Sequence, residues 1–307
     1  MVTSRAAAPA PCGALDWERD GADWPNRRSS RFVEAGGLTW HVQVMGRGPP
    51  LLLVHGTGAS THSFRDLAPA LAARFTVVAP DLPGHAFTSP LPPGSVSFDG
   101  MASALGELVQ ALGLNPQVAV GHSAGAALLA RLALDGVIAP RLLVALNGAI
   151  LPLPGVAGLV FAPMARALAV NGLAARLFAW RAADRRAVER LVGSTGSKID
   201  ERGVELYARL VRNPAHVAGV LGMMANWDLG ALRDALPRVP CRLLLVVGSE
   251  DGTVSPREAE RVRAILPDAR IVRLEGLGHL AHEERPDEVA RLIEREAAGA
   301  ATKGGRE

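Results

Sequence analysis

The chain of 307 residues has only two cysteines, Cys12 and Cys241. Two cysteines make neither a disulfide framework nor a cysteine-rich metal set, and they fit a reducing cytoplasm. No histidine cluster has metal-ligand spacing either, so the sequence predicts no metal centre and no cofactor.

Charge of one sign and long apolar runs are also scarce. The net charge is +3, and the 33 basic residues form no block, so we expect no nucleic-acid binding. The first twelve residues lack a strong apolar segment, and we expect no signal peptide. The nearest approach to a membrane span, residues 149–165, holds three prolines and is shorter than the roughly 20 residues required. Peripheral contact of the protein with a membrane surface is an alternative that the sequence leaves undecided.

Apolar runs of strand length alternate with helical patterns along most of the chain. The expected strands are Arg31–Glu34, Leu38–Val44, Leu51–Val54, Thr76–Ala79, Gln117–Val120, Arg141–Leu146, Arg242–Val247 and Ala269–Leu274. The expected helices are Phe64–Phe75, Met101–Leu114, Ala126–Leu134, Pro256–Leu266 and Asp287–Ala297. Repeated strand–helix units predict an α/β fold with a mainly parallel, doubly wound sheet.

The alternation stops near residue 149 and resumes near residue 240. The stretch between is helical, apolar and too long for a loop. We therefore expect an N-terminal lead-in at 1–30, a core at 31–148 and 240–297, a helical cap at 149–239 and a flexible tail at 298–307.

The pentapeptide Gly121-His122-Ser123-Ala124-Gly125 lies between an expected strand and an expected helix. Strand, G-x-S-x-G and helix in this order predict a nucleophile elbow, a tight turn that holds the serine in a strained conformation above the sheet edge. The helix N-terminus adds a positive field and free N–H groups. The alternative is an ordinary glycine-bounded turn with a solvated serine.

A serine nucleophile needs a base, and the base needs an orienting acid. Asp251 follows the seventh expected strand and His279 the eighth, where the carboxyl ends of parallel strands meet. We assign Ser123 as nucleophile, His279 as general base and acid, and Asp251 as the group that fixes the imidazole tautomer. Glu250 is the rival acid, and a lone Asp or His in such a loop is usually structural.

Acyl transfer also needs N–H donors for an oxyanion. We expect them from Ala124 and from Thr57, in the glycine-containing loop after the third strand; the alternative for that loop is a plain turn.

We expect the cap to cover a substrate pocket. Its expected lining residues are Phe161, Met223, Met224 and Trp227, although most such side chains in a cap form its own core. Met and aromatic side chains suit a large, flat, apolar ligand.

These motifs, in the order Ser, Asp, His, resemble the α/β-hydrolase superfamily over residues 31–297. A closer resemblance is to the BchO family of photosynthetic bacteria, described as the magnesium chelatase accessory protein or 30 kDa subunit of bacteriochlorophyll synthesis. The segments that carry it are Asp23–Arg27, Ser30–Val33, Trp40–Gly46, His55–Gly58, Gly121–Ala126 and Gly222–Leu229. This resemblance implies a role around insertion of magnesium into protoporphyrin IX, and it does not specify a reaction for the serine.

Three hypotheses remain open. The first is a serine hydrolase serving tetrapyrrole synthesis, and the second is a non-catalytic accessory that binds a porphyrin or magnesium chelatase subunits under its cap. The third is a generic carboxylesterase or lipase. No G-x-x-x-x-G-K-[ST] loop is present, so ATP hydrolysis would belong to separate subunits. A dehalogenase or epoxide hydrolase of this fold would need a carboxylate in place of Ser123.

Overall fold

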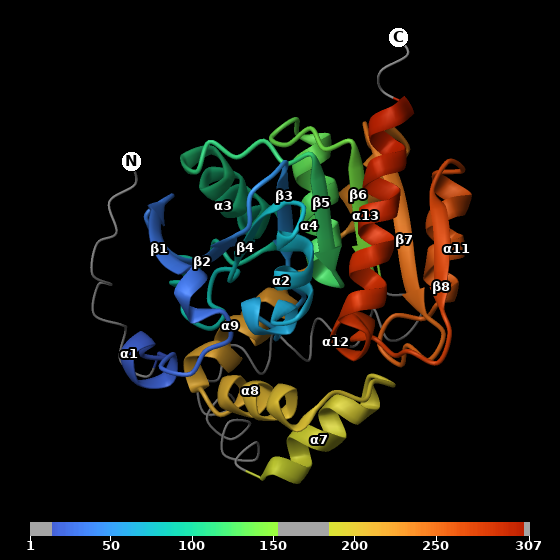
Figure 1. Cartoon of the computed structure of the whole chain (residues 1–307). Helices are drawn as coiled ribbons and strands as arrows, with labels where there is room; N and C mark the ends of the chain where they lie inside the picture. The colour runs from blue at the N-terminus through green and yellow to red at the C-terminus, as the bar shows by residue number, and fades with distance from the viewer. Residues whose placement is uncertain (1–13, 153–183, 304–307) are drawn as a thin grey trace.

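The computed structural model describes residues 14–152 and 184–303, which are arranged around one eight-stranded sheet (Figure 1). Its strands are β1 (Ser30–Ala35), β2 (Leu38–Met45), β3 (Pro50–Val54), β4 (Thr76–Pro80), β5 (Val118–His122), β6 (Leu142–Leu146), β7 (Arg242–Gly248) and β8 (Arg270–Leu274). The strand order is β1-β2-β4-β3-β5-β6-β7-β8. β2 pairs antiparallel with β1 and β4, and every other pair is parallel. The expected α/β fold with a mainly parallel sheet is confirmed.

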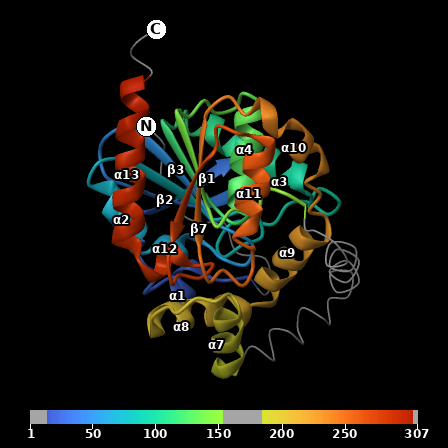
Figure 2. The ribbon, with the colours of Figure 1, turned by 90° about the vertical axis from the view of Figure 1, so that its right-hand side faces the viewer.

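Helices cover both faces of the sheet, as Figure 2 shows. On one face lie α2 (Leu67–Ala72) and α13 (Pro286–Lys303); on the other lie α3 (Phe98–Ala111), α4 (Ala124–Leu134), α10 (Gly230–Ala235) and α11 (Arg257–Ile265). Because both faces are covered, every residue of β5 and β6 is buried. This explains why those strands are continuous apolar runs in the sequence.

Among the described residues, a further group of helices lies beyond the carboxyl ends of the strands (Figure 1). They are α7 (Arg185–Ser194), α8 (Glu201–Val211) and α9 (Pro214–Ala225), and we call them the cap helices. Asp184, Asp200 and Asn213 cap their N-termini by accepting backbone N–H bonds. The limits of the cap stay a prediction.

The N-terminal lead-in packs against α8. It contains α1 (Trp17–Asp20) and the 3-10 helix η1 (Arg27–Ser29). Trp24, 2% exposed, shares an apolar cluster with residues of α8. The Asp23 carboxylate forms ion pairs of 2.6 Å with both Arg202 and Arg209, and the Arg209 hydrogen bond is the main cause that lowers the Asp23 pKa well below its usual range. The Asp23–Arg27 segment therefore joins the lead-in to the cap.

The C-terminal helix corrects one expectation. α13 continues to Lys303, whereas the sequence predicts a flexible tail from residue 298. Ala300 is 6% exposed and belongs to the apolar cluster that includes α2, so the helix is packed against the core at least as far as this residue. The described part of the expected tail, up to Lys303, is therefore helical, and its flexibility stays a prediction.

Candidate active site

Ser123 occupies a strained turn between β5 and α4. Its φ of 50° and ψ of −118° lie in a region that side-chain-bearing residues rarely adopt. The turn is tight because α4 presses on β3: a Cβ atom at Gly125 would lie only 2.2 Å from the Val54 carbonyl oxygen. Ser123 itself is half-buried, so its side chain keeps access to solvent. This is the backbone geometry expected of a nucleophile elbow.

His279 and Asp251 are hydrogen-bonded to each other. The Nδ1 atom of His279 lies 2.8 Å from Oδ2 of Asp251, while Oδ1 accepts backbone N–H bonds from Thr253 (2.7 Å) and Val254 (2.8 Å). A carboxylate only accepts, so it places the imidazole proton on Nδ1 and leaves Nε2 as a proton acceptor. Glu250 is exposed, and it is Asp251 that pairs with His279.

Asn147 is a further member of this cluster that the sequence analysis did not assign. It directly follows β6, is 1% exposed and has a φ of 47°. Its side-chain amide donates to Oδ2 of Asp251 at 2.7 Å and to the Gly278 carbonyl at 3.4 Å. The available signal was its position, a polar residue immediately after a fully apolar strand.

His122 links the serine turn to the base. Its Nε2–H donates to the His279 carbonyl at 3.0 Å, and its ring lies 4.7 Å from the His279 ring and 4.4 Å from the His282 ring. Burial is the main cause that lowers the pKa of His122 well below its usual value and that of His282 to about 3. Both rings are therefore neutral at pH 7.

The nucleophile and the base do not form a direct bond in this state. Ser123 and His279 are both described, and they share no hydrogen bond. In serine hydrolases the hydrogen bond between nucleophile and base tightens when a substrate binds.

The loop after β3 runs beside Ser123. A Cβ atom at Gly56 would lie 2.9 Å from the Cβ of Ser123, so the Gly56–Thr57 backbone passes directly along the serine. Ala124 is the first residue of α4, and the first N–H groups of a helix lack partners within it. Both expected oxyanion donors therefore lie on segments that flank Ser123.

The expected pocket residues differ in their surroundings. Met223 is fully buried, and its sulfur accepts a 3.7 Å hydrogen bond from the Thr57 hydroxyl. Met224 is half-buried, and Trp227 packs edge-on against Phe98 of α3 at 5.0 Å. Trp227 thus packs against a helix outside the expected cap, and its role in lining a pocket stays a prediction. Phe161 lies outside the described residues.

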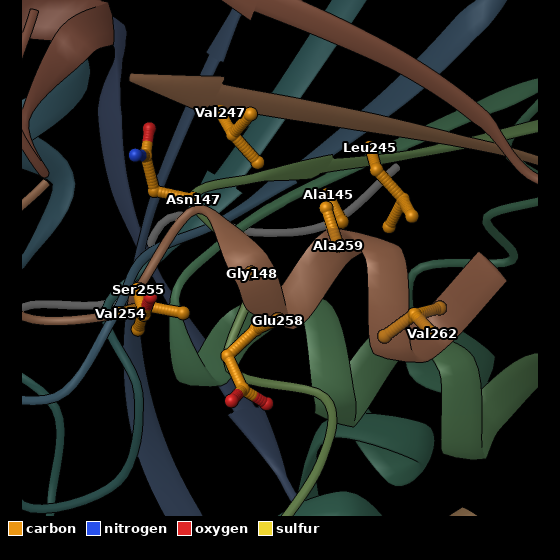
Figure 3. A pocket seen from close by; sticks show the side chains of 10 residues that line it. All are labelled: Ala145, Asn147, Gly148, Leu245, Val247, Val254, Ser255, Glu258, Ala259 and Val262. Atoms are coloured by element: carbon orange, nitrogen blue, oxygen red, sulfur yellow. The ribbon is translucent and has the colours of Figure 1, made fainter. Parts of the chain in front are cut away.

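A small cavity lies between β6, β7 and α11 (Figure 3). Its lining residues are Ala145, Asn147, Gly148, Leu245, Val247, Val254, Ser255, Glu258, Ala259 and Val262. Its volume of about 10 Å³ matches a single water molecule and is too small for an organic substrate.

Across residues 14–152 and 184–303, no group of three or more His, Cys, Asp or Glu side chains is arranged to hold a metal ion. No helix in those ranges is long and apolar enough to cross a membrane.

Comparison with known proteins identifies the family of the chain. A sequence model of the alpha/beta hydrolase family matches residues 51–292. The chain is 40% identical to the magnesium-chelatase 30 kDa subunit of Rhodobacter capsulatus, over 89% of this chain and 95% of that protein. It is also 28% identical to haloalkane dehalogenase 2 of Mycobacterium tuberculosis, over 86% of this chain and 93% of that protein.

Solved structures share the fold at lower identity. A putative lipase of Acinetobacter baumannii superposes with a TM-score of 0.76 at 18% identity, covering 97% of this chain and all of that one. The epoxide hydrolase CorEH superposes with a TM-score of 0.74 at 22% identity, covering 87% and 97%. The chain belongs to the alpha/beta hydrolase family and, within it, to the family of the magnesium-chelatase 30 kDa subunit.

Proposed function

We propose that the protein is a serine hydrolase that uses Ser123 as nucleophile, His279 as general base and acid, and Asp251 as the orienting acid. The observation that carries the proposal is the His279–Asp251 hydrogen bond, held next to a serine turn strained to a φ of 50°. A turn with only a structural role would not require a nearby imidazole whose Nε2 atom remains a proton acceptor.

The reaction is acyl transfer in two steps. Ser123 Oγ bonds to the carbonyl carbon of an ester while its proton moves to Nε2 of His279, and the N–H groups of Thr57 and Ala124 stabilise the oxyanion. His279 then gives that proton to the leaving alcohol as its bond to carbon breaks. Water hydrolyses the acyl-enzyme by the same sequence, with His279 again accepting and returning the proton.

We further propose that this site serves magnesium–tetrapyrrole synthesis in the cytoplasm, beside the subunits of a magnesium chelatase. The 40% identity to the magnesium-chelatase 30 kDa subunit supports this context, and an ester-bearing tetrapyrrole is the substrate class that combines it with serine chemistry. Similarity to a haloalkane dehalogenase supports no dehalogenase activity, because Ser123 stands where that reaction would need a carboxylate.

Covalent labelling with a fluorophosphonate tests the site. We expect labelling of the wild-type protein and none of Ser123→Ala or His279→Ala. Ser194→Ala, which removes an exposed hydroxyl on α7, is the matched control and should label normally. A folded wild-type protein that takes up no label would overturn the proposal.

The second candidate is a non-catalytic accessory that binds a porphyrin or chelatase subunits, and the name of the 40% identical relative favours it. Pigment analysis of a strain that carries only Ser123→Ala separates the two. Normal pigment with stably expressed protein supports the accessory, whereas pigment loss supports the hydrolase.

A further inference from the structure

The turn between α7 and α8 lies directly against the loops that carry the acid and the base. We call residues Thr195–Lys198 the strap. The Thr195 carbonyl accepts two backbone N–H bonds, from Gly252 at 3.0 Å and from His279 at 3.1 Å. One oxygen of the cap thus holds the residue after Asp251 together with the base itself.

The rest of the strap holds the two neighbours of His279. The hydroxyl of Ser197, a residue 4% exposed, accepts the N–H of Leu280 at 2.8 Å. Glu284 bridges the other side: one carboxylate oxygen accepts the Lys198 N–H at 3.0 Å, and the other accepts the Gly278 N–H at 2.8 Å. Three successive amides around the base therefore depend on the strap, directly or through one carboxylate.

The strap and the acid loop approach each other closely along their backbones. Gly196 has a φ of 79°, and a Cβ atom there would lie 1.8 Å from the Glu250 carbonyl oxygen. A side chain at this position would push the strap away from the acid loop. Gly193, three residues earlier on α7, has nothing within 4 Å of such an atom.

We propose that the strap is a positioning segment that aligns His279 with Asp251 and couples the placement of the cap helices to the reactivity of Ser123. This inference rests on the proposed hydrolase function. The Thr195 carbonyl and the Ser197 hydroxyl bond the backbone of the acid and base loops directly, and Lys198 reaches Gly278 through Glu284. A displacement of the α7–α8 turn therefore moves the imidazole relative to the serine. Displacements of about 1 Å at a reacting group reduce rates by roughly a hundredfold.

Two matched pairs of variants test the proposal. Gly196→Ala is compared with Gly193→Ala, and Ser197→Ala with Ser194→Ala, whose hydroxyl donates only to the Leu191 carbonyl. We expect fluorophosphonate labelling rates to fall about ten- to a hundredfold in the strap variants and to stay within about twofold in the controls. If Gly196→Ala does not fold, Ser197→Ala decides the outcome, since it removes a single acceptor.

A second readout separates positioning from general destabilisation. Proton NMR of the His279 Nδ1–H, together with hydrogen exchange of the His279 and Gly252 amides, reports the strap contacts without any catalytic step. Strap variants should shift that proton signal and speed those exchanges while distant core amides stay protected. Strap variants that match their controls in both readouts would overturn the proposal. If the wild type takes up no label, the proposed function fails and the NMR comparison alone decides on the strap.

Discussion

Two of the residues at the centre of the site share an unusual backbone. Ser123 and Asn147 have φ values of 50° and 47° although neither is glycine. They directly follow β5 and β6, which are neighbours in the sheet. Strain of this kind costs about 1–3 kcal/mol per residue and persists where surrounding contacts impose it. Asn26 and Ala86 are the other non-glycine residues with positive φ in the described ranges, and asparagine adopts this region more readily than most residues. Ser123 is therefore the site residue at which the strain is most informative.

Asn147 should support Asp251 measurably. Asn147→Ala removes the 2.7 Å bond to Oδ2 of Asp251, and loss of a hydrogen bond to a charged group lowers the free energy of unfolding by about 1.5–3 kcal/mol. Urea unfolding measures this, and the labelling rate of Ser123 should fall in parallel. Asn226→Ala is the control, because its amide donates to the Gly222 carbonyl at an exposed position and its loss should cost less than about 0.5 kcal/mol. Equal unfolding curves for the two variants would contradict the role of Asn147.

The sequence predicts individual site residues where a motif or chain order marks them. Ser123, Asp251 and His279 each follow an expected strand, and the structure places Asp251 and His279 in contact. Asn147 and the strap were not assigned, because their roles depend on which strands become neighbours and on where the cap turn meets the sheet edge. The local pattern of apolar and polar residues shows neither which strands are neighbours nor where the cap turn meets the sheet. Whether the three assigned residues act together stays a prediction.

Secondary-structure elements follow the sequence closely where both faces are buried. Each expected strand agrees with the structure to within two residues. The central parallel strands are easily predicted because they are buried and therefore appear as continuous apolar runs. The expected helix Phe64–Phe75 is instead divided into the 3-10 helix η2 (Thr61–Phe64) and α2. Pro69 explains the division: it has no N–H to bond the carbonyl four residues earlier, so the α-helix begins shortly before it.

The contact between β3 and α4 should tolerate no added atom. Gly125→Ala would place its Cβ 2.2 Å from the Val54 carbonyl oxygen, so we expect a loss of about 1–3 kcal/mol in unfolding free energy, or no folded protein. In Gly106→Ala on α3, the nearest atom to the new Cβ is Val137 Cγ1 at 3.5 Å. This control should gain up to about 1 kcal/mol from helix propensity. Thermal unfolding compares them, and a Gly125 variant as stable as wild type would refute a tight elbow.

At the scale of the whole molecule, all eight histidines are buried. The pKa is lowered, chiefly by burial, in six of them: His55, His62, His85, His122, His216 and His282. These six resist protonation in the folded protein and accept protons readily once the chain unfolds. Glu283 has the opposite effect on how stability depends on pH, because burial raises its pKa to about 7 in the folded protein.

Stability should therefore fall as the pH drops below about 6.5, the ordinary histidine pKa. A group with a lowered folded pKa binds more protons in the unfolded state, so its contribution is present above the unfolded pKa and is lost toward the folded pKa, about 4 for His216 and about 3 for His282. Between pH 7.5 and pH 5, each of these two histidines should lower the free energy of unfolding by about 2 kcal/mol. Glu283 should raise it by about the amount that one histidine lowers it.

Urea unfolding at a series of pH values between 7.5 and 5 measures the slope. His282→Gln removes one titrating ring from the cluster around the base, and its unfolding free energy should vary less with pH than that of wild type, by about 2 kcal/mol across this range. An exposed histidine would give no such difference, because its pKa would be the same in both states. Parallel pH profiles for the variant and wild type would mean that folding leaves the pKa of His282 unchanged, and the effect of burial assigned to this ring would then be wrong.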